Sequence, residues 1–255
     1  MGRVLRPGPG SMRGLEWLVR VGPAPLGAWR CAMGWSEVAA RSHARRLEQA
    51  GWLARYPMKR GEGSLFVATR RGVGMTGLPV TAAVVPAATW WAHLSATAWV
   101  AAWLTTRGRE IQGPREVLAD PSWTGRLRWH DRNGFHRVGH RPDLAWLVDG
   151  QRVAIEVELV QKSIARLRAI LELHAHWRAS GKSAGVIYVC ADEPGCARIR
   201  KRAAEAGLHP GKGGGLRVEP LETIKVAAVA ASVRHRVAAT AGAPNRPDPA
   251  RSASH

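Results

Sequence analysis

Three acidic side chains at regular spacing carry the strongest chemical signal in this sequence of 255 residues. Asp143 precedes one run of aliphatic residues, and Glu156 and Glu158 stand two residues apart within the next run. Side chains two apart in a β-strand point to the same face, so both glutamates share one face of the expected strand. Carboxylates that meet in a buried place repel one another, and a hard divalent cation removes that repulsion. We therefore predict a Mg²⁺ or Mn²⁺ site at Asp143, Glu156 and Glu158.

The expected strand register agrees with this chemistry. A hairpin that closes at Asp149 and Gly150 would bring residue 143 opposite roughly residue 156. Lys162 follows at the entry of the next helix, where an ammonium group could stabilise negative charge. Three alternatives remain open for the glutamates: a solvated edge-strand face, contacts with a basic neighbouring helix, or ion pairs with nearby arginines (Arg137, Arg141, Arg152).

The elements that must position these residues occupy 90–225, where helical and strand-like segments alternate. A helix rich in Ala and Trp (90–108) is followed by three strand-like segments (125–134, 141–150, 151–160), an amphipathic helix (162–181), an apolar strand (184–190), a polar helix (196–206) and a last strand near 215–221. This order predicts an α/β sandwich around a mixed sheet. His93, among apolar neighbours, is expected to be a core histidine. His174 and His176 point to different sides of their helix and do not share a metal easily.

The pattern of apolar residues and turn residues over 12–76 predicts a smaller unit of three helices and a β-hairpin. Ser36 has the chemistry of an N-cap for the third helix, which ends near Gly51. Three helices with a basic-tipped hairpin are typical of a winged helix-turn-helix, which reads the major groove with its third helix. The expected DNA-binding residues are Arg41, Ser42, Arg45, Arg46 and Gln49 on that helix, with Lys59 and Arg60 at the hairpin tip. A winged helix used for protein contacts is the alternative.

Charge and composition favour a polyanionic partner. The chain has 38 Lys and Arg against 19 Asp and Glu, a net charge of +19 and a pI near 11.5. Double-stranded DNA fits this excess, although GC-rich codons would also produce abundant arginine. Three cysteines without zinc-type spacing indicate a reducing, cytoplasmic location.

Two segments are expected to lie outside the folded units. Residues 72–106 contain no Asp, Glu, Lys or Arg, but their prolines and alanines favour a linker (77–89) before a buried helix rather than a membrane span. The first residues, rich in Pro and Gly, do not form a signal peptide. The composition of residues 235–255 predicts a disordered tail.

The motif "RPD…VAIEVELVQKS", followed by an amphipathic helix, resembles the core of PD-(D/E)XK nucleases. Over residues 12–225 the chain more closely resembles the replication-relaxation proteins encoded by plasmids and integrated elements of high-GC bacteria. This resemblance implies that Asp143 and Glu156 hold the metal, with Glu158 standing where the superfamily usually has a lysine. Lys162 would be the displaced lysine, and Glu116, in "GREIQGPREVL", would complete the catalytic set.

The implied function is replication or relaxation of a plasmid-like or mobile element, with Mg²⁺-dependent cleavage of a phosphodiester. Replication or mobilisation proteins of the same element, or a second copy of the chain, would be partners. Two other functions stay open. One is a DNA-binding replication or transcription regulator with an inactive nuclease fold, and the other is an adaptor that recruits a nuclease or relaxase.

Overall fold

The computed structural model describes residues 7–58, 63–80, 87–211 and 213–241, so the predicted tip residues Lys59 and Arg60 lie outside the described residues. The first part of the chain combines helices with a small antiparallel sheet of order β1-β3-β2, whose strand β1 lies between the first two helices. Its elements are α1 (Pro9–Val21), β1 (Ala24–Pro25), α2 (Leu26–Met33), α3 (Glu37–Gln49), β2 (Leu53–Pro57), β3 (Ser64–Ala68) and α4 (Arg70–Thr76). The predicted cap is confirmed, because the Ser36 hydroxyl accepts a hydrogen bond of 3.2 Å from the amide of Ala39.

The second part contains a six-stranded mixed sheet of order β10-β11-β9-β8-β7-β4. Its elements are η1 (Ala88–Trp90), α5 (Trp91–Thr105), β4 (Glu110–Gln112), α6 (Pro114–Ala119), η2 (Pro121–Trp123), β5 (Gly125–Asp131), β6 (Gly134–His140), β7 (Leu144–Val148), β8 (Gln151–Glu158), α7 (Ile164–Ala179), β9 (Gly185–Cys190), α8 (Glu193–Glu205), β10 (His209–Pro210), β11 (Gly215–Pro220) and α9 (Leu221–Ala241). Strands β4, β7 and β8 pair antiparallel, whereas β8, β9, β11 and β10 pair parallel. The predicted α/β class with a mixed sheet is confirmed.

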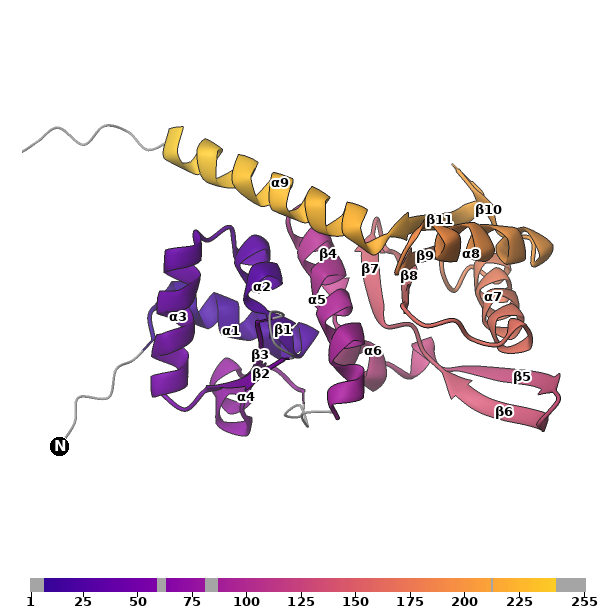
Figure 1. The fold of residues 1–255 in the computed structure, drawn as a ribbon, viewed down its shortest axis with the longest axis horizontal. Coiled ribbons are helices and arrows are strands. Elements are labelled where there is room, and N and C mark those ends of the chain that lie inside the picture. The colour runs from indigo at the N-terminus through magenta and orange to yellow at the C-terminus, as the bar shows by residue number, and fades with distance from the viewer. Residues whose placement is uncertain (1–6, 59–62, 81–86, 212, 242–255) are drawn as a thin grey trace, which may run out of the picture.

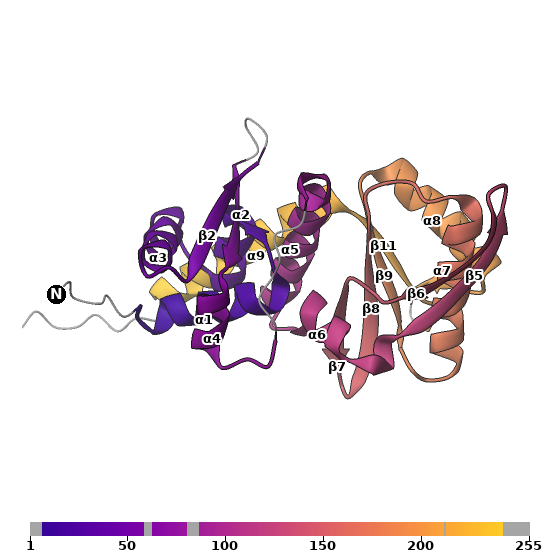
Figure 2. The same ribbon diagram turned by 90° about the horizontal axis from the view of Figure 1, so that it is seen from below.

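Alternation along β8 separates two cores. Ile155 and Val157 face the apolar core that includes residues of α5 and α9, while Ala154 faces the core that includes residues of α7 and α8. Figures 1 and 2 show α7 and α8 together on one side of the sheet, with α5 between the sheet and the first part of the chain. Helix α7 is the crossover between the parallel strands β8 and β9.

The predicted register of β7 and β8 is confirmed. Leu144 pairs with Ile155, and the Asp143 amide donates to the Ile155 carbonyl at 2.9 Å. Asp143, one residue before Leu144, therefore stands opposite Glu156. The φ of Asp149 is 47° and that of Gly150 is 74°, as the tight turn between antiparallel strands requires.

Two sequence-based expectations are wrong. The strand expected at 125–134 does not join the main sheet; β5 pairs with β6, a strand that the sequence did not predict, in a separate hairpin. The tail expected from residue 235 is helical up to Ala241, because alanines and valines continue α9 without a glycine or proline before Gly242.

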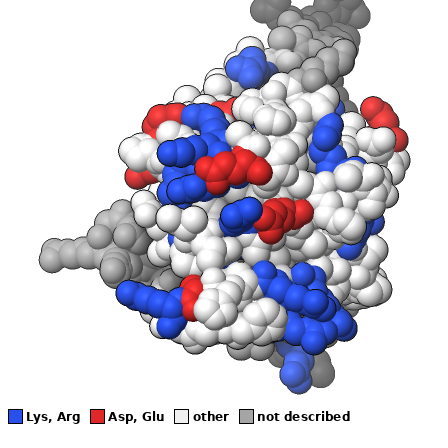
Figure 3. Space-filling view, turned by 90° about the vertical axis from the view of Figure 1, so that its right-hand side faces the viewer, with Lys and Arg blue, Asp and Glu red and all other residues white. Residues whose placement is uncertain are grey.

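One apolar core runs from the first part of the chain to the sheet. It joins Trp29 of α2 and Leu47 of α3 to Trp103 of α5 and Ile155 of β8. In the part of the chain that the structure describes, no helix is both long and apolar enough to span a lipid bilayer. Seen from the end that carries β5, β6 and α8, the surface gathers Lys and Arg in several groups, some of them with acidic side chains alongside (Figure 3).

Candidate active site

Asp143 and Glu156 line one pocket of about 860 Å³ beside the β7–β8 pair. Lys162, from the loop between β8 and α7, lines the same pocket. Two further cations, Arg141 and Arg166, also contribute to its wall. The structure therefore brings Asp143 and Glu156 together with three cationic side chains at one concave site, which Asp131 also lines.

Asp143 is fixed by contacts from two elements. Its Oδ1 lies 3.0 Å from Nε2 of His93 on α5, and its Oδ2 accepts a hydrogen bond of 2.8 Å from the Val157 amide on β8. Burial lowers the pKa of His93, but the hydrogen bond and the negative charge of Asp143 outweigh burial, so this pKa is raised. His93 is therefore a pocket residue that contacts Asp143, rather than the core histidine expected from the sequence.

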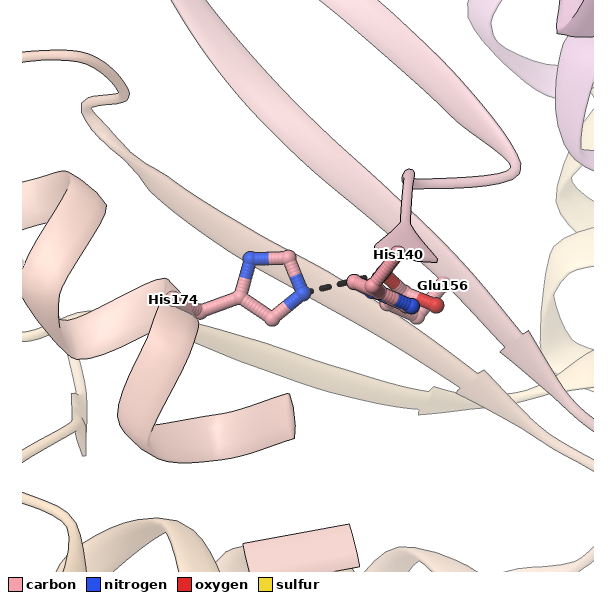
Figure 4. A group of neighbouring side chains, drawn as sticks. All are labelled: His140, Glu156 and His174. Atoms are coloured by element: carbon pink, nitrogen blue, oxygen red, sulfur yellow. Dashed lines mark hydrogen bonds and ion pairs between the residues drawn. The ribbon is translucent and has the colours of Figure 1, made fainter. Parts of the chain in front are cut away.

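Glu156 is buried, with 5% of its surface exposed, and accepts two hydrogen bonds at Oε1. The donors are Nε2 of His140, at 2.8 Å, and Nε2 of His174, at 2.9 Å. Figure 4 shows the His174 ring reaching the carboxylate from α7, with His140 beside Glu156 on the strand side. Burial alone would raise the pKa of Glu156, but the two histidines hold this pKa well below its ordinary value.

The pKa values of the two histidines shift in opposite directions. Burial lowers the pKa of His140, yet the charge of Glu156 more than offsets burial and raises it. Burial lowers the pKa of the fully buried His174, and Glu156 offsets only part of this effect. The pKa of His140 therefore lies above that of His174, so His140 is the first of the two rings to take up a proton as the pH falls.

His140, Glu156 and His174 could hold a metal ion, because their ligand atoms lie within 4.8 Å of one another; among the described residues no other group of three does so. A metal on Nε2 of His174 would place the ring proton on Nδ1. That atom is buried and has no hydrogen-bond partner among the described residues. The same Nδ1 also lacks a partner when Nε2 donates to Glu156, so this atom does not decide between a metal centre and the hydrogen-bonded network.

Glu158 shares the strand face of Glu156 but does not line the pocket. The Lys162 ammonium donates to Glu158 Oε2, and the Arg198 guanidinium on α8 lies 3.7 Å from Oε1. The expected three-carboxylate cation site is therefore not assembled. For Glu158, the alternative of contacts with a basic neighbouring helix is the one that the structure shows. Lys162 and Arg198 already neutralise this carboxylate.

Glu116 begins α6, as expected, but lies outside the pocket. Its Oε2 accepts a hydrogen bond of 2.8 Å from the Gly113 amide, and its Oε1 lies 3.5 Å from the Arg20 guanidinium on α1. Glu116 thus caps its own helix and links that helix to the first part of the chain. The structure does not place it with Asp143, Glu156 and Lys162.

Asp143 and Glu156 both line the pocket, and carboxylates are the side chains that a hard divalent cation prefers. Such ions commonly bind through one or two carboxylates plus water and phosphate oxygens. Sequence patterns predicted Asp143 and Glu156 as site residues, but they did not assign His93, His140 or His174 to the site. Of these, His140 stands directly before the "RPD" motif, which is the one local signal that could have revealed it.

The exposed side of α3 carries most of the residues expected to bind DNA. Arg45, Arg46 and Gln49 are exposed, and Ser42 is partly buried. Arg41 is exposed too, but its guanidinium lies 2.6 Å from Glu37 Oε1. Ala40, Ala44 and Leu47 are buried, so α3 is amphipathic as the sequence predicted.

Comparisons with known proteins add little. No protein-family model matches the chain, and no curated protein matches it. Among solved structures, protein VC1899 from Vibrio cholerae matches with a TM-score of 0.36 and 10% sequence identity, over 91% of this chain and 58% of that one. This chain thus spans less than two thirds of the length of that protein, and a likeness at this level supports no functional conclusion.

Acid should weaken the fold through Glu156. Its folded-state pKa lies below the ordinary 4.5, so its contribution to stability is present above about pH 4.5 and is lost as the pH falls further. In urea unfolding between about pH 6 and pH 3, we expect the midpoint to fall less steeply for Glu156→Gln than for the wild type. Glu116→Gln, as control, should follow the wild type. Parallel curves for Glu156→Gln and the wild type would show that this carboxyl titrates normally.

Proposed function

We propose that this protein binds double-stranded DNA and hydrolyses a phosphodiester bond in it with Mg²⁺ or Mn²⁺. The observation that carries the proposal is the pocket in which Asp143, Glu156 and Lys162 meet. This arrangement agrees with the resemblance to the PD-(D/E)XK nuclease core. The two carboxylates come from the antiparallel strands β7 and β8 or the residue just before them, and the lysine precedes the crossover helix α7. The role would be replication, relaxation or mobilisation of a plasmid-like or mobile element.

Each pocket residue has a definite task under this proposal. Asp143 and Glu156 would hold the cation, which when bound lowers the pKa of a water molecule and polarises the phosphate. His93 keeps Asp143 oriented, and His140 with His174 keeps Glu156 ionised. The Lys162 ammonium stabilises the negative charge that grows on the phosphate in the transition state.

The arginines of the pocket and the exposed side of α3 would supply DNA binding. Arg141 and Arg166 line the pocket, where their guanidinium groups suit the phosphates on either side of the scissile bond. The front unit fits a winged helix-turn-helix with α3 in the major groove and Arg45 and Arg46 directed to DNA. The net charge of +19 supports the same partner.

A second candidate is a DNA-binding protein that does not cleave. It is favoured by one observation: Lys162 and Glu158 pair with each other, so part of the expected catalytic set is already engaged. Under this reading Asp143 and Glu156 are structural, and the DNA-binding surfaces are unchanged.

Nicking of a supercoiled plasmid in Mg²⁺ or Mn²⁺ tests the proposal. The wild type should nick, and Asp143→Asn should lower the rate by more than about 100-fold, since a metal ion supplies several kcal/mol of transition-state stabilisation. Glu116→Gln is the matched control, because it removes a carboxylate outside the pocket, and it should retain the rate. Equal rates for Asp143→Asn and the wild type, or no metal-dependent nicking by the wild type, would refute cleavage and favour the second candidate.

A further inference from the structure

The β5–β6 hairpin stands apart from the main sheet. Its two strands pair only with each other among the described residues, and Figures 1 and 2 show it extending from the end of the molecule beyond α6. Its base is anchored, since Leu127 is buried and a Cβ on Gly125 would lie 2.4 Å from Leu173 Cδ2 on α7. A two-stranded ribbon is marginally stable alone, so this anchor keeps it formed.

Arginine dominates the outward face of this hairpin. Arg126 and Arg128 alternate with inward residues along β5, and Arg137 lies directly opposite Arg128 on β6. Arg132 is exposed in the turn, and Phe135 is 67% exposed on the outward face. Four exposed arginines thus follow one short ribbon.

These four guanidinium groups differ in their ion pairing from the arginines of the neighbouring helices. Among the described residues, Arg126, Arg128, Arg132 and Arg137 form no ion pair, whereas several arginines of α7 and α8 do: Arg168, Arg198, Arg200 and Arg202. The one acid of the hairpin, Asp131, is held 2.9 Å from His136 Nε2 on the inward face. Like charges directly opposite in a sheet repel, so the Arg128–Arg137 pair costs stability until an anion neutralises it.

The hairpin is continuous with the candidate active site. Trp129, Asp131 and Asn133 line the pocket, so the turn that carries Arg132 lies at its edge. Trp129 and Asp131 belong to the inward face, so a polyanion on the outward arginines would reach Arg141 and Arg166 in the pocket wall by passing around the turn at Arg132.

We infer that the β5–β6 hairpin is a DNA-binding arm that holds the phosphates of a B-form duplex beside the pocket. The inference rests on the proposed function and adds a second contact surface, separate from α3. A duplex suits the arm because a two-stranded ribbon fits the major groove, where both of its strands can reach phosphates. Phe135 contacts the groove between the arginines.

The salt dependence of duplex binding tests the arm. For Arg128→Ala/Arg137→Ala, the slope of log affinity against log salt should become shallower by about 2, since each phosphate contact contributes about 0.9. The control is Arg168→Ala/Arg202→Ala, which removes the same charge from arginines that already pair with glutamates. Its slope should stay near that of the wild type. Thermal unfolding of each variant verifies folding, and the hairpin variant should melt no lower than the wild type.

The outcomes separate the arm from the proposed function. If the wild type does not bind duplex DNA, the proposed function fails and the arm with it. A second outcome refutes the arm alone. In it the wild type binds duplex DNA and Arg45→Ala weakens this binding, but Arg128→Ala/Arg137→Ala has the same salt slope as the control Arg168→Ala/Arg202→Ala. Equal slope changes in both double variants would also refute it. If Arg128→Ala/Arg137→Ala changed the salt slope for single-stranded DNA as much as the slope for duplex DNA, the duplex would be ruled out as the specific ligand of the hairpin.

Discussion

Replacing Glu156 by alanine is expected to lower the free energy of unfolding by about 3–5 kcal/mol. The substitution removes the acceptor shared by His140 and His174. Both rings are largely buried, with side-chain exposures of 12% and 1%. A buried pair that loses one partner leaves the other without compensation, and this cost far exceeds that of an exposed pair. Urea unfolding at neutral pH measures it.

Two comparisons show whether the loss comes from the network. Glu116→Ala breaks a half-exposed ion pair and a helix cap, and should cost about 1 kcal/mol. In Glu156→Ala/His174→Ala the loss should be smaller than the sum of the two single losses, because the second substitution removes a group that the first has stranded. Strictly additive losses would mean that Glu156 and His174 are not coupled.

Replacing Trp177 by alanine should also cost about 3–5 kcal/mol, as is usual for a large aromatic side chain in a core. Trp177 on α7 is 2% exposed, and its ring centroid lies 5.8 Å from that of Trp123 and 5.2 Å from that of His174. It also packs against Gly125, the first residue of β5. The substitution should therefore loosen both the Glu156 network and the base of the hairpin.

Amide hydrogen exchange reports the local part of this effect. In Trp177→Ala, amides of β5 and β6 should exchange faster relative to those of β9, which lies at the centre of the main sheet. Trp90→Ala is the aromatic control, because Trp90 is 59% exposed, and it should change stability by less than about 0.5 kcal/mol. Unchanged protection of β5 and β6 in Trp177→Ala would show that α7 does not hold the hairpin.

Features that depend on short-range rules could be predicted from the sequence. Strand alternation placed Glu156 and Glu158 on one face, and the Asp149–Gly150 turn fixed Asp143 opposite Glu156. Ser36 was recognised as an N-cap because its side chain bonds within one helical turn. Each of these inferences needs only a few neighbouring residues.

The composition of the site depends on contacts that no local pattern contains. His93 and His174 reach the acids from α5 and α7, and Arg198 reaches Glu158 from α8, 40 residues along the chain. Tertiary packing decides which side chains reach these acids, so local patterns do not distinguish a cation site from ion pairs at Glu158. Strand β6 was missed for another reason: its exposed, polar sequence has few apolar residues to show alternation.

The apolar core that runs from α3 through α5 to β8 has a geometric consequence. Under the proposed function, a DNA-binding unit and a cleaving unit joined by a flexible linker would sample many separations along the double helix. Here the helix between them is packed on both sides, so the offset from recognised bases to the broken bond would be built into the protein itself. Cleavage products would then carry ends at one constant distance from the recognised sequence, whatever the length of DNA around it.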